Sequence, residues 1–366
     1  MPMGYSVRPY QPGDEEGIVE LLELVFNGWP HFDLECTPLD HWTWKYLDNP
    51  IGNKVISICM NNDKIIGCFH SIPRLTKIGS RILMSGHGAD VAVHPDYRRL
   101  GIQNSMNIIV DNLRKKIDTN ILYIETGSQI LFKRYLKMYP RFPYKIIRLF
   151  KMQDIDLHMR MMPVKYGWLM KHGFYLISLF NKFKNCFWSI TFSGQNFSIS
   201  KIDSFDERVD EFWDRIRSSY DFIVVRDHRY LNWRYCDKRG GNYIIKIAEE
   251  NKQILGYIVL RINKYNEEYP IGYIIDLLTI QNRLDVVDSL LKHAIEFFHN
   301  NNINVILYRI IKNHSYEKIA KKYGFINDPS KIVNFYKLFE INEEDFFKFR
   351  LSNADKIHFV LGDYDI

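Results

Sequence analysis

The chain repeats itself at a distance of one domain, and this duplication limits the fold more than any other feature of the sequence. Trp44-Lys45-Tyr46 in the first half corresponds to Trp233-Arg234-Tyr235 in the second, 189 positions later (233 minus 44). Ile121-Leu122-Tyr123 and Ile306-Leu307-Tyr308 follow in the same order at an offset of 185 (306 minus 121). An offset of this size is typical of a duplicated domain rather than of a solenoid repeat. The sequence therefore predicts two similar domains in tandem.

Both halves show the same order of predicted elements. Apolar, β-branched runs at Val55–Met60 and Ile65–Ile72 flank a polar turn, as the two strands of a hairpin do. A buried strand, Asp90–Val93, an amphipathic helix after Gly101 and a further strand, Ile121–Glu125, come next. This order predicts an α+β fold with two tandem domains, each a mixed, mostly antiparallel sheet flanked by helices. The second half has the corresponding predicted strands Tyr243–Ala248, Ile254–Ile262, Tyr273–Leu278 and Val305–Ile310, with a helix between the last two.

The duplicated segments also set the predicted domain limits. Residues 1–150 form the first domain and residues 201–345 a second, degenerate one, separated by a helical and aromatic connector at 151–200 and followed by a C-terminal tail at 346–366. The most apolar stretch, Tyr166–Phe192, lies in the connector, and charged residues divide it into runs too short to span a bilayer. It is interpreted as a segment packed between the domains, with a position on a membrane surface as the alternative.

Charge and cysteine content narrow the class of protein. Lys and Arg exceed Asp and Glu by 49 to 43, and no basic run accompanies this mild excess, so we expect no nucleic-acid partner. The five cysteines have no metal or redox spacing, which predicts a reduced, cytoplasmic protein. The twelve histidines lack ligand spacing, so we expect no metal. The first ten residues contain no apolar segment of a signal peptide.

The segment from Ala89 to Ile102 carries the most specific chemical signal. It reads as a strand that ends at Pro95, a polar turn and a helix that starts after Gly101. A glycine at this turn lets the backbone approach a ligand closely. The first turn of the helix presents unpaired N–H groups and the positive end of the helix dipole, and Arg98 and Arg99 add charge. Together these features predict a seat for a pyrophosphate.

This segment resembles the motif Arg/Gln-x-x-Gly-x-Gly/Ala of the GCN5-related N-acetyltransferase (GNAT) superfamily. Arg98 and Gly101 match the motif, whereas Gln103 stands where the family has a small residue. The resemblance implies an acyl-coenzyme A donor and one binding site for it, in the first half, because Ile280–Asp285 of the second half contains no glycine. It implies that Val91, Ala92 and Val93 contact the pantetheine arm, and that Arg98, Arg99, Leu100, Gly101, Ile102 and Gln103 hold the pyrophosphate.

Transfer of an acyl group to an amine needs a proton acceptor for the amine and a proton donor for the thiolate. Asp90 and His87 lie near the expected position of the acyl group, and we expect one of them to act as the base, directly or through water. The alternatives are local hydrogen bonding for Asp90 and packing for His87. By the family resemblance, Tyr135 protonates the departing thiolate; the alternative is an ordinary half-buried tyrosine.

Tandem versions of this fold resemble the N-acyltransferases that modify nucleotide-linked amino sugars in surface-polysaccharide biosynthesis. In them the second domain holds the acceptor. Arg234 is then expected to meet the diphosphate, and Tyr230 and Trp233 to stack on the base or sugar, with packing as the alternative for Trp233. Trp29 and His31 are further candidates, since their loop borders the acceptor cleft in this fold.

Several properties of the reaction stay open at this point. The acyl group is expected to be acetyl or a hydroxyacyl group such as 3-hydroxybutyryl, and the protein to be a monomer or a weak homo-oligomer. One alternative is acylation of a protein lysine, a polyamine or an antibiotic. Another is a non-catalytic or aminoacyl-transferring tandem protein. A basic pocket with aromatic walls would favour the nucleotide sugar, whereas an acidic cleft would favour a polycation.

Overall fold

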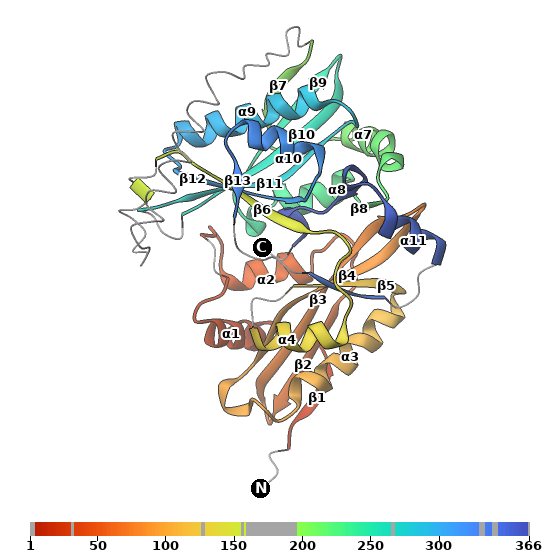
Figure 1. Cartoon of the computed structure of the whole chain (residues 1–366). Helices are drawn as coiled ribbons and strands as arrows, with labels where there is room; N and C mark the ends of the chain where they lie inside the picture. Colours follow the sequence, from red (N-terminus) through yellow and green to blue (C-terminus); the bar gives the residue numbers. More distant parts are fainter. Residues whose placement is uncertain are drawn as a thin grey trace, which may run out of the picture.

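The computed structural model describes residues 4–30, 33–125, 129–154, 157–158, 196–264, 268–328, 334–338 and 343–364. Within these residues the strands form one sheet of eight and one of seven strands. In Figure 1 the two sheets form a lower and an upper body, with the C-terminal end of the chain between them. Both sheets combine antiparallel and parallel pairs and are flanked by helices, so the predicted tandem α+β fold is confirmed.

The lower body is a sheet covered by helices on both faces. Side chains along a strand alternate between the faces of a sheet. Ile56 and Ile58 therefore pack against the first two helices, whereas Val55 and Cys59 pack against the third. The elements are β1 (Ser6–Pro9), α1 (Glu15–Phe26), α2 (Pro38–Tyr46), β2 (Val55–Asn61), β3 (Lys64–Ile78), β4 (Arg81–Val93), α3 (Ile102–Lys116), β5 (Thr119–Ile124) and α4 (Gln129–Met138).

The upper body repeats this layering. Ile258 and Leu260 pack against α9 and α10, whereas Tyr257 and Val259 face α7 and α8. The elements are β7 (Ser198–Ile202), α7 (Arg208–Ile216), α8 (His228–Leu231), β9 (Tyr243–Glu250), β10 (Gln253–Asn263), β11 (Ile271–Thr279), α9 (Leu284–Asn300), β12 (Val305–Ile311), α10 (Ser315–Lys322) and β13 (Ile326–Asn327).

The two bodies exchange strands. β6 (Ile146–Met152), which follows the first half, pairs with β12 of the upper sheet, where Figure 1 shows it in yellow. β14 (Phe335–Leu338), which follows the second half, pairs with β5 of the lower sheet. The predicted limit at residue 150 thus falls inside β6, and hydrogen bonding divides the chain differently from the repeat. Of the predicted connector, Tyr166–Phe192 lies outside the described residues.

The C-terminal elements fasten the bodies together. β8 (Phe222–Val224) continues the lower sheet along β3, and β15 (Ile357–His358) pairs with β8. α11 (Glu343–Leu351) precedes β15, and a short turn that is buried from Leu361 to Tyr364 follows it. The C-terminal segment therefore runs through the interface between the bodies instead of forming a detached tail.

The repeated tryptophans form a symmetric contact between the halves. The rings of Trp44 and Trp233 are stacked with centroids 5.1 Å apart. The indole Nε1 of each donates to the backbone carbonyl of the other, at 2.8 Å from Trp44 and 3.0 Å from Trp233. Two equivalent residues that pair across an approximate two-fold axis both serve packing, which explains why the tryptophan is present in both copies.

Candidate active site

The lower sheet splits open where the family resemblance places the pantetheine arm. β4 and β5 pair in parallel from Met84 to His87, and the pairing ends there, although β4 continues to Val93. From Gly88 onward, β4 keeps only β3 as a strand partner in the described part of the chain. Its other backbone edge faces a widening gap. Val91, Ala92 and Val93 lie on this stretch, so their backbone is placed where an extended arm can pair with it.

A β-bulge at Asp90 changes the direction of the open backbone edge of β4. The register between β3 and β4 shifts between Cys68 and His70, and Asp90 has a φ of +42°. A β-bulge bends its strand and turns backbone groups away from the regular ladder. The bulge thus redirects the N–H groups of β4 toward the gap, where they can meet a carbonyl oxygen.

The predicted pyrophosphate seat has the geometry of an anion site. Arg99 and Gly101 both have left-handed backbone, with φ of +69° and +81°, and Gly101 is the residue on which α3 begins. A Cβ on Gly101 would meet nothing within 4 Å, so the turn opens to solvent. Arg98, Arg99 and Leu100 are exposed there, whereas Ile102 is buried as the first core contact of α3. The first turn of α3 contains no acidic residue.

In the second half, the positive N-terminal end of the equivalent helix already has a carboxylate beside it. α9 begins after Arg283, and Asp285 lies within its first turn. The Asp285 carboxylate forms an ion pair with Arg283 at 2.8 Å. The pKa of Asp285 is lowered by the hydrogen bond from Arg283, by its charge and by backbone N–H groups of the helix start. A helix terminus that holds its own carboxylate is a poor seat for a phosphate.

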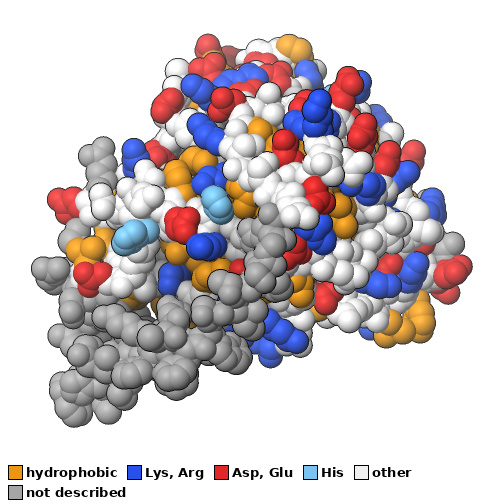
Figure 2. Space-filling view, turned by 90° about the horizontal axis from the view of Figure 1, so that it is seen from above, with side chains coloured by type: hydrophobic (Ala, Val, Ile, Leu, Met, Phe, Trp, Pro, Cys, Tyr) orange, Lys and Arg blue, Asp and Glu red, His pale blue; other side chains and the backbone are white. Residues whose placement is uncertain are grey.

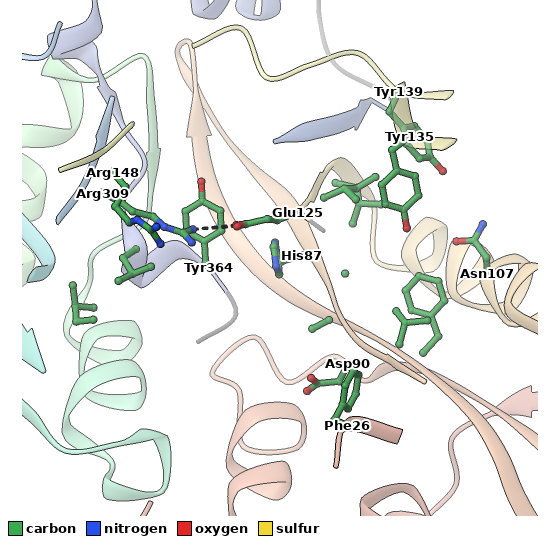
Figure 3. Close-up of a pocket in the computed structure, with 18 of the residues that line it drawn as sticks. Phe26, His87, Asp90, Asn107, Glu125, Tyr135, Tyr139, Arg148, Arg309 and Tyr364 are labelled. Carbon is green, nitrogen blue, oxygen red and sulfur yellow. Dashed lines mark hydrogen bonds and ion pairs between the residues drawn. The ribbon is translucent and has the colours of Figure 1, made fainter. Parts of the chain in front are cut away.

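A single cavity of about 770 Å³ leads from the first turn of α3 through the open gap to the upper sheet. Its labelled side chains converge in Figure 3, with His87 between Glu125 and Asp90. Two sheets and the C-terminal segment contribute to the wall. The residues that line the cavity include Gln103, Asn107 and Arg114 of α3; His87, Gly88, Asp90 and Val91 of β4; Glu125; Tyr135 and Tyr139; and, from the upper sheet and the C-terminal segment, Arg148, Arg261, Tyr273, Arg309 and Tyr364.

Asp90 lines the cavity, but its carboxylate is held by three donors. It accepts from Trp29 Nε1 at 3.0 Å, from Lys45 Nζ at 2.7 Å and from the Tyr46 hydroxyl at 2.5 Å. Burial alone would raise the pKa of Asp90, but the charge of Lys45 and these hydrogen bonds outweigh burial and lower it to about 2. Such a carboxylate accepts a proton weakly at neutral pH.

The second half uses its equivalent carboxylate in the same way. Asp276 of β11 is fully buried and accepts from Arg226 at 3.0 Å and from Tyr235, the counterpart of Tyr46, at 3.1 Å. In both copies a buried aspartate binds side chains of neighbouring elements beside a bulged strand. We therefore assign Asp90 to stabilising the bulge and consider His87 as the base.

His87 differs from Asp90 in having a ring nitrogen that no described residue occupies. It is 3% exposed and lines the cavity. Burial lowers the pKa of His87 well below its ordinary value, so the ring is neutral at physiological pH. Within the described residues, its Nδ1 atom is buried and has no hydrogen-bond partner. A neutral imidazole can donate or accept a hydrogen bond at such a nitrogen.

Tyr135 on α4 also lines the cavity, as the resemblance implies for the proton donor. Its ring lies 5.5 Å from that of Tyr139 and 6.1 Å from that of Phe335. In Figure 3 Tyr135 and Asp90 lie apart, and His87 lies to one side of both. The structure thus brings His87 and Tyr135 to one space from different elements.

The predicted acceptor residues lie elsewhere. Arg234 is 3% exposed, and its guanidinium donates to the Gly362 carbonyl at 3.2 Å and to the Tyr243 hydroxyl at 3.0 Å. Tyr230 is buried beneath Arg226, and Trp233 pairs with Trp44. Trp29 is buried and donates a hydrogen bond to Asp90. His31 lies outside the described residues. None of the four described residues is among those that line the cavity.

Three arginines that the sequence reasoning missed face the cavity instead. Arg148 comes from β6 and Arg309 from the neighbouring strand β12, whereas Arg261 comes from β10, which β11 separates from β12. Three strands of the upper sheet thus bring these arginines to one cavity. They are paired with Asp328 at 2.7 Å, Asp33 at 3.9 Å and Glu125 at 3.2 Å, respectively. The Arg309 guanidinium also lies 4.7 Å from the ring centroid of Tyr364. Arginines on single strands give no signal until the strand order is known.

Three further features of the described residues concern membrane spans, metal ions and surface charge. No helix of the described part is long and apolar enough to cross a membrane. Among the described residues no group of three or more His, Cys, Asp and Glu is placed to hold a metal ion. Figure 2 shows basic and acidic side chains interspersed over the face seen from above, rather than a basic stripe.

Comparison with known proteins defines the class. Residues 6–124 match the model of the acetyltransferase (GNAT) domain family. No curated protein matches the chain by sequence. A GCN5-related N-acetyltransferase from Anabaena variabilis is similar in structure, with a TM-score of 0.60 and 11% identity over 92% of this chain and 73% of that one. N-myristoyltransferase from Saccharomyces cerevisiae, with bound myristoyl-CoA and inhibitors, has a TM-score of 0.59 and 12% identity over 93% and 80%.

Residues 6–124 therefore match an acetyltransferase (GNAT) domain, and the chain as a whole shares the tandem α+β fold of these solved structures. The donor of such a domain is an acyl-coenzyme A.

Proposed function

We propose that this protein transfers an acyl group from acyl-coenzyme A to the amine of an anionic acceptor, namely a nucleotide-linked amino sugar. The observation that carries this proposal is the trio Arg148, Arg261 and Arg309 at the end of the cavity opposite the pyrophosphate seat. Arginine forks bind diphosphates with paired hydrogen bonds, and the aromatic walls Tyr273 and Tyr364 offer stacking surfaces.

The donor enters from the lower body. Its pyrophosphate binds at Arg98 to Gln103 and its pantetheine arm lies along the open edge of β4 from Gly88 to Val93. This course puts the thioester beside His87 and Tyr135. The acceptor enters from the upper body, so the strand exchange that brings β6 into the upper sheet also completes the acceptor side of the site.

The chain's own groups then support each proton movement. The amine nitrogen attacks the thioester carbonyl, and a backbone N–H of the bulged strand donates to the developing oxyanion. Nδ1 of His87 accepts the amine proton, directly or through one water molecule. When the C–S bond breaks, the Tyr135 hydroxyl donates its proton to the leaving thiolate, and the amide product and coenzyme A result.

His87 is expected to control turnover and not donor binding. His87→Leu removes the accepting nitrogen and replaces the ring by an apolar side chain of similar size. The kcat should fall by about 10²-fold or more. The affinity for coenzyme A, measured by calorimetry, should stay within threefold. His314→Asn is the matched control, because His314 is another buried neutral histidine whose Nδ1 accepts a helix-start N–H, which asparagine can replace. An unchanged kcat in folded His87→Leu would remove His87 from the mechanism.

Arg309 is expected to recognise the nucleotide portion of the acceptor. Two acceptors separate this role from general damage: an amino sugar linked to a nucleoside diphosphate, and the same amino sugar without it. Arg309→Met should raise the KM of the first about 10- to 100-fold, the range of a lost charged hydrogen bond, and leave that of the second and of acyl-coenzyme A unchanged. Arg208, half-buried and outside the cavity, supplies the control Arg208→Met. Equal rises for both sugars would contradict the anionic acceptor.

The proposal extends to the cellular compartment and the oligomeric state of the protein. Cys36, Cys59, Cys68 and Cys236 are free thiols in the described part, consistent with a reducing compartment. We propose a cytoplasmic protein that acts as a monomer or a weak homo-oligomer, since each chain supplies both sides of its cavity.

A further inference from the structure

A buried arginine deep in the donor half of the cavity has no role in the reaction described above. Arg114 lies near the end of α3 and is 1% exposed, yet it lines the cavity together with Gln103 and Asn107 of the same helix. These three residues fall on one helical face, so α3 forms one wall of the donor channel along its length. Buried arginines are rarely left without partners for all their donors.

Two of the guanidinium nitrogens of Arg114 are accounted for. Nε donates to the Ser71 hydroxyl at 3.2 Å, and Nη1 donates to Asp111 at 2.9 Å. The third, Nη2, is buried and has no hydrogen-bond partner among the residues that the structure describes. An ideal Cβ on Gly88 would lie 3.9 Å from Nη2, so the absence of a side chain at Gly88 keeps the space beside this donor open.

The local charge favours an electron-rich ligand. Asp111 is the carboxylate next to Arg114, and it also accepts from Lys337 Nζ at 2.8 Å. The Asp111 carboxylate is thus shared between two cationic side chains. A buried cationic donor without an acceptor is unfavourable in the free protein. An oxygen of a bound ligand would satisfy it.

The depth of Arg114 indicates which part of the donor lies there. Arg114 is 12 residues after the first residue of α3 (114 minus 102), or about 18 Å along the helix at a rise of ~1.5 Å per residue. A pantetheine arm has about as many backbone bonds as roughly four residues of extended chain, which span about 14 Å. An arm that starts at the pyrophosphate seat thus ends before Arg114. The acyl group, attached beyond the sulfur, is the part that reaches Nη2.

We propose that Arg114 Nη2 binds an oxygen atom on the acyl group itself, so that the preferred donor is an acyl-coenzyme A with a hydroxyl or carboxylate on its acyl chain. This inference rests on the proposed function for the path of the donor. The shared chemistry is a hydrogen-bond acceptor beyond the thioester carbonyl, and Arg114 sets donor specificity. A plain hydrocarbon acyl group of equal length would leave the buried donor unsatisfied.

Binding of three donors of equal chain length tests the proposal without any acceptor. The donors are butyryl-, 3-hydroxybutyryl- and succinyl-coenzyme A, titrated calorimetrically into the full chain. One or both oxygenated donors should bind about 10- to 150-fold more tightly than the butyryl donor, the range of one charged hydrogen bond. The order of the two oxygenated donors distinguishes a hydroxyl from a carboxylate ligand. Equal affinities for all three in the unmodified protein would overturn the proposal.

Two substitutions locate the effect. Arg114→Met should reduce the preference to about onefold and leave the affinity for free coenzyme A, which lacks the acyl group, within threefold. Gly88→Ala is the second variant, because it keeps Arg114 and its partners and places a methyl group in ordinary contact with Nη2; it should also lower the preference. A preference that survives in both folded variants, or an equal loss for all donors and free coenzyme A, contradicts this role of Arg114.

Turnover separates this inference from the proposed function. If oxygenated donors bind selectively but no nucleotide-linked amino sugar releases free thiol, the proposed acceptor is wrong and Arg114 keeps its role. If turnover occurs equally with all three donors and binding is equal too, the role of Arg114 is wrong and the acyltransferase proposal stands.

Discussion

Gly101→Glu is expected to abolish measurable binding of coenzyme A to the folded protein. Gly101 has a φ of +81° and opens to solvent at the start of α3, where the pyrophosphate is expected. A glutamate there adds a carboxylate beside the phosphates. Like charges about 4 Å apart repel by ~4 kcal/mol at an effective dielectric constant of 20, about a thousandfold in affinity. The left-handed backbone also costs about 1–2 kcal/mol for a residue with a Cβ, which weakens the turn itself.

Gly52 supplies a matched control for this substitution. Its φ is +73°, and a Cβ there would also meet nothing within 4 Å. Gly52→Glu therefore has the same backbone strain and adds the same charge, but at a turn that does not line the cavity. It should lower stability slightly and bind coenzyme A with unchanged affinity. Calorimetric titration of both variants checks the pair, and a Gly101→Glu protein that binds within threefold of the unmodified one would refute the pyrophosphate seat.

The protein is expected to lose most of its stability between pH 6.5 and pH 5. Burial lowers the pKa of His41 to about 3 and the pKa values of His70 and His314 to about 4, and it lowers that of His87 in the same direction. In the unfolded chain a histidine titrates near pH 6.5. Below that pH the unfolded chain binds protons that the folded chain excludes, so the free energy of unfolding falls as the pH falls.

The size of the effect follows from three of these histidines. At pH 5, which is about 1.5 pH units below the unfolded pKa, each contributes about 2 kcal/mol, and the three together about 6 kcal/mol. This is comparable to the whole net stability of a typical protein, about 5–15 kcal/mol. The pKa of Asp90, lowered to about 2, does not offset the loss, because its stabilisation is complete above the unfolded value near 3.9 and declines only below it.

Urea unfolding at pH 7.5, 6.5, 5.5 and 5 measures this dependence. His314→Asn should reduce the loss between pH 6.5 and pH 5 by about 2 kcal/mol, since it removes one buried group that resists protonation. His299→Asn is the control, because His299 is exposed on α9 and should leave the slope unchanged. A free energy of unfolding that stays constant from pH 7.5 to pH 5 would show that these histidines are not neutral in the folded protein.

Local patterns predicted the elements of the lower sheet and helix α3 closely, and they fell short where a pattern conflicted with its context. The predicted strands Ile65–Ile72 and Asp90–Val93 belong to the longer strands β3 and β4. Pro73 follows the first prediction directly, and proline is unusual inside a sheet. In the structure Pro73 pairs with Gly86 of β4 at a point where β2 has ended and β8 has not yet begun. Its missing N–H therefore costs no ladder bond on the other side.

The repeat had two consequences for function that sequence alone could not separate. It led us to predict the donor site in the first half, and the structure shows a chemical difference between the halves there: Gly101 and its open turn have no equivalent at Arg283 and Asp285. It also drew attention to Trp233 and Arg234, whose conservation between the copies arises from packing. A duplicated residue type indicates a shared structural task, whereas a residue that differs between copies is free to serve one site.

The sequence by itself determined the tandem α+β fold, the turn at Gly101 and the helix that begins there, because these depend on local backbone preference and on periodic burial. Only the tertiary structure decided that Asp90 is held as an ion pair, that His87 and Arg114 face one cavity, and that Arg148, Arg261 and Arg309 meet at its far end. The exchange of β6 and β14 between the sheets sets the strand neighbours. Strand order is fixed by long-range hydrogen bonds and packing, and no local pattern records them.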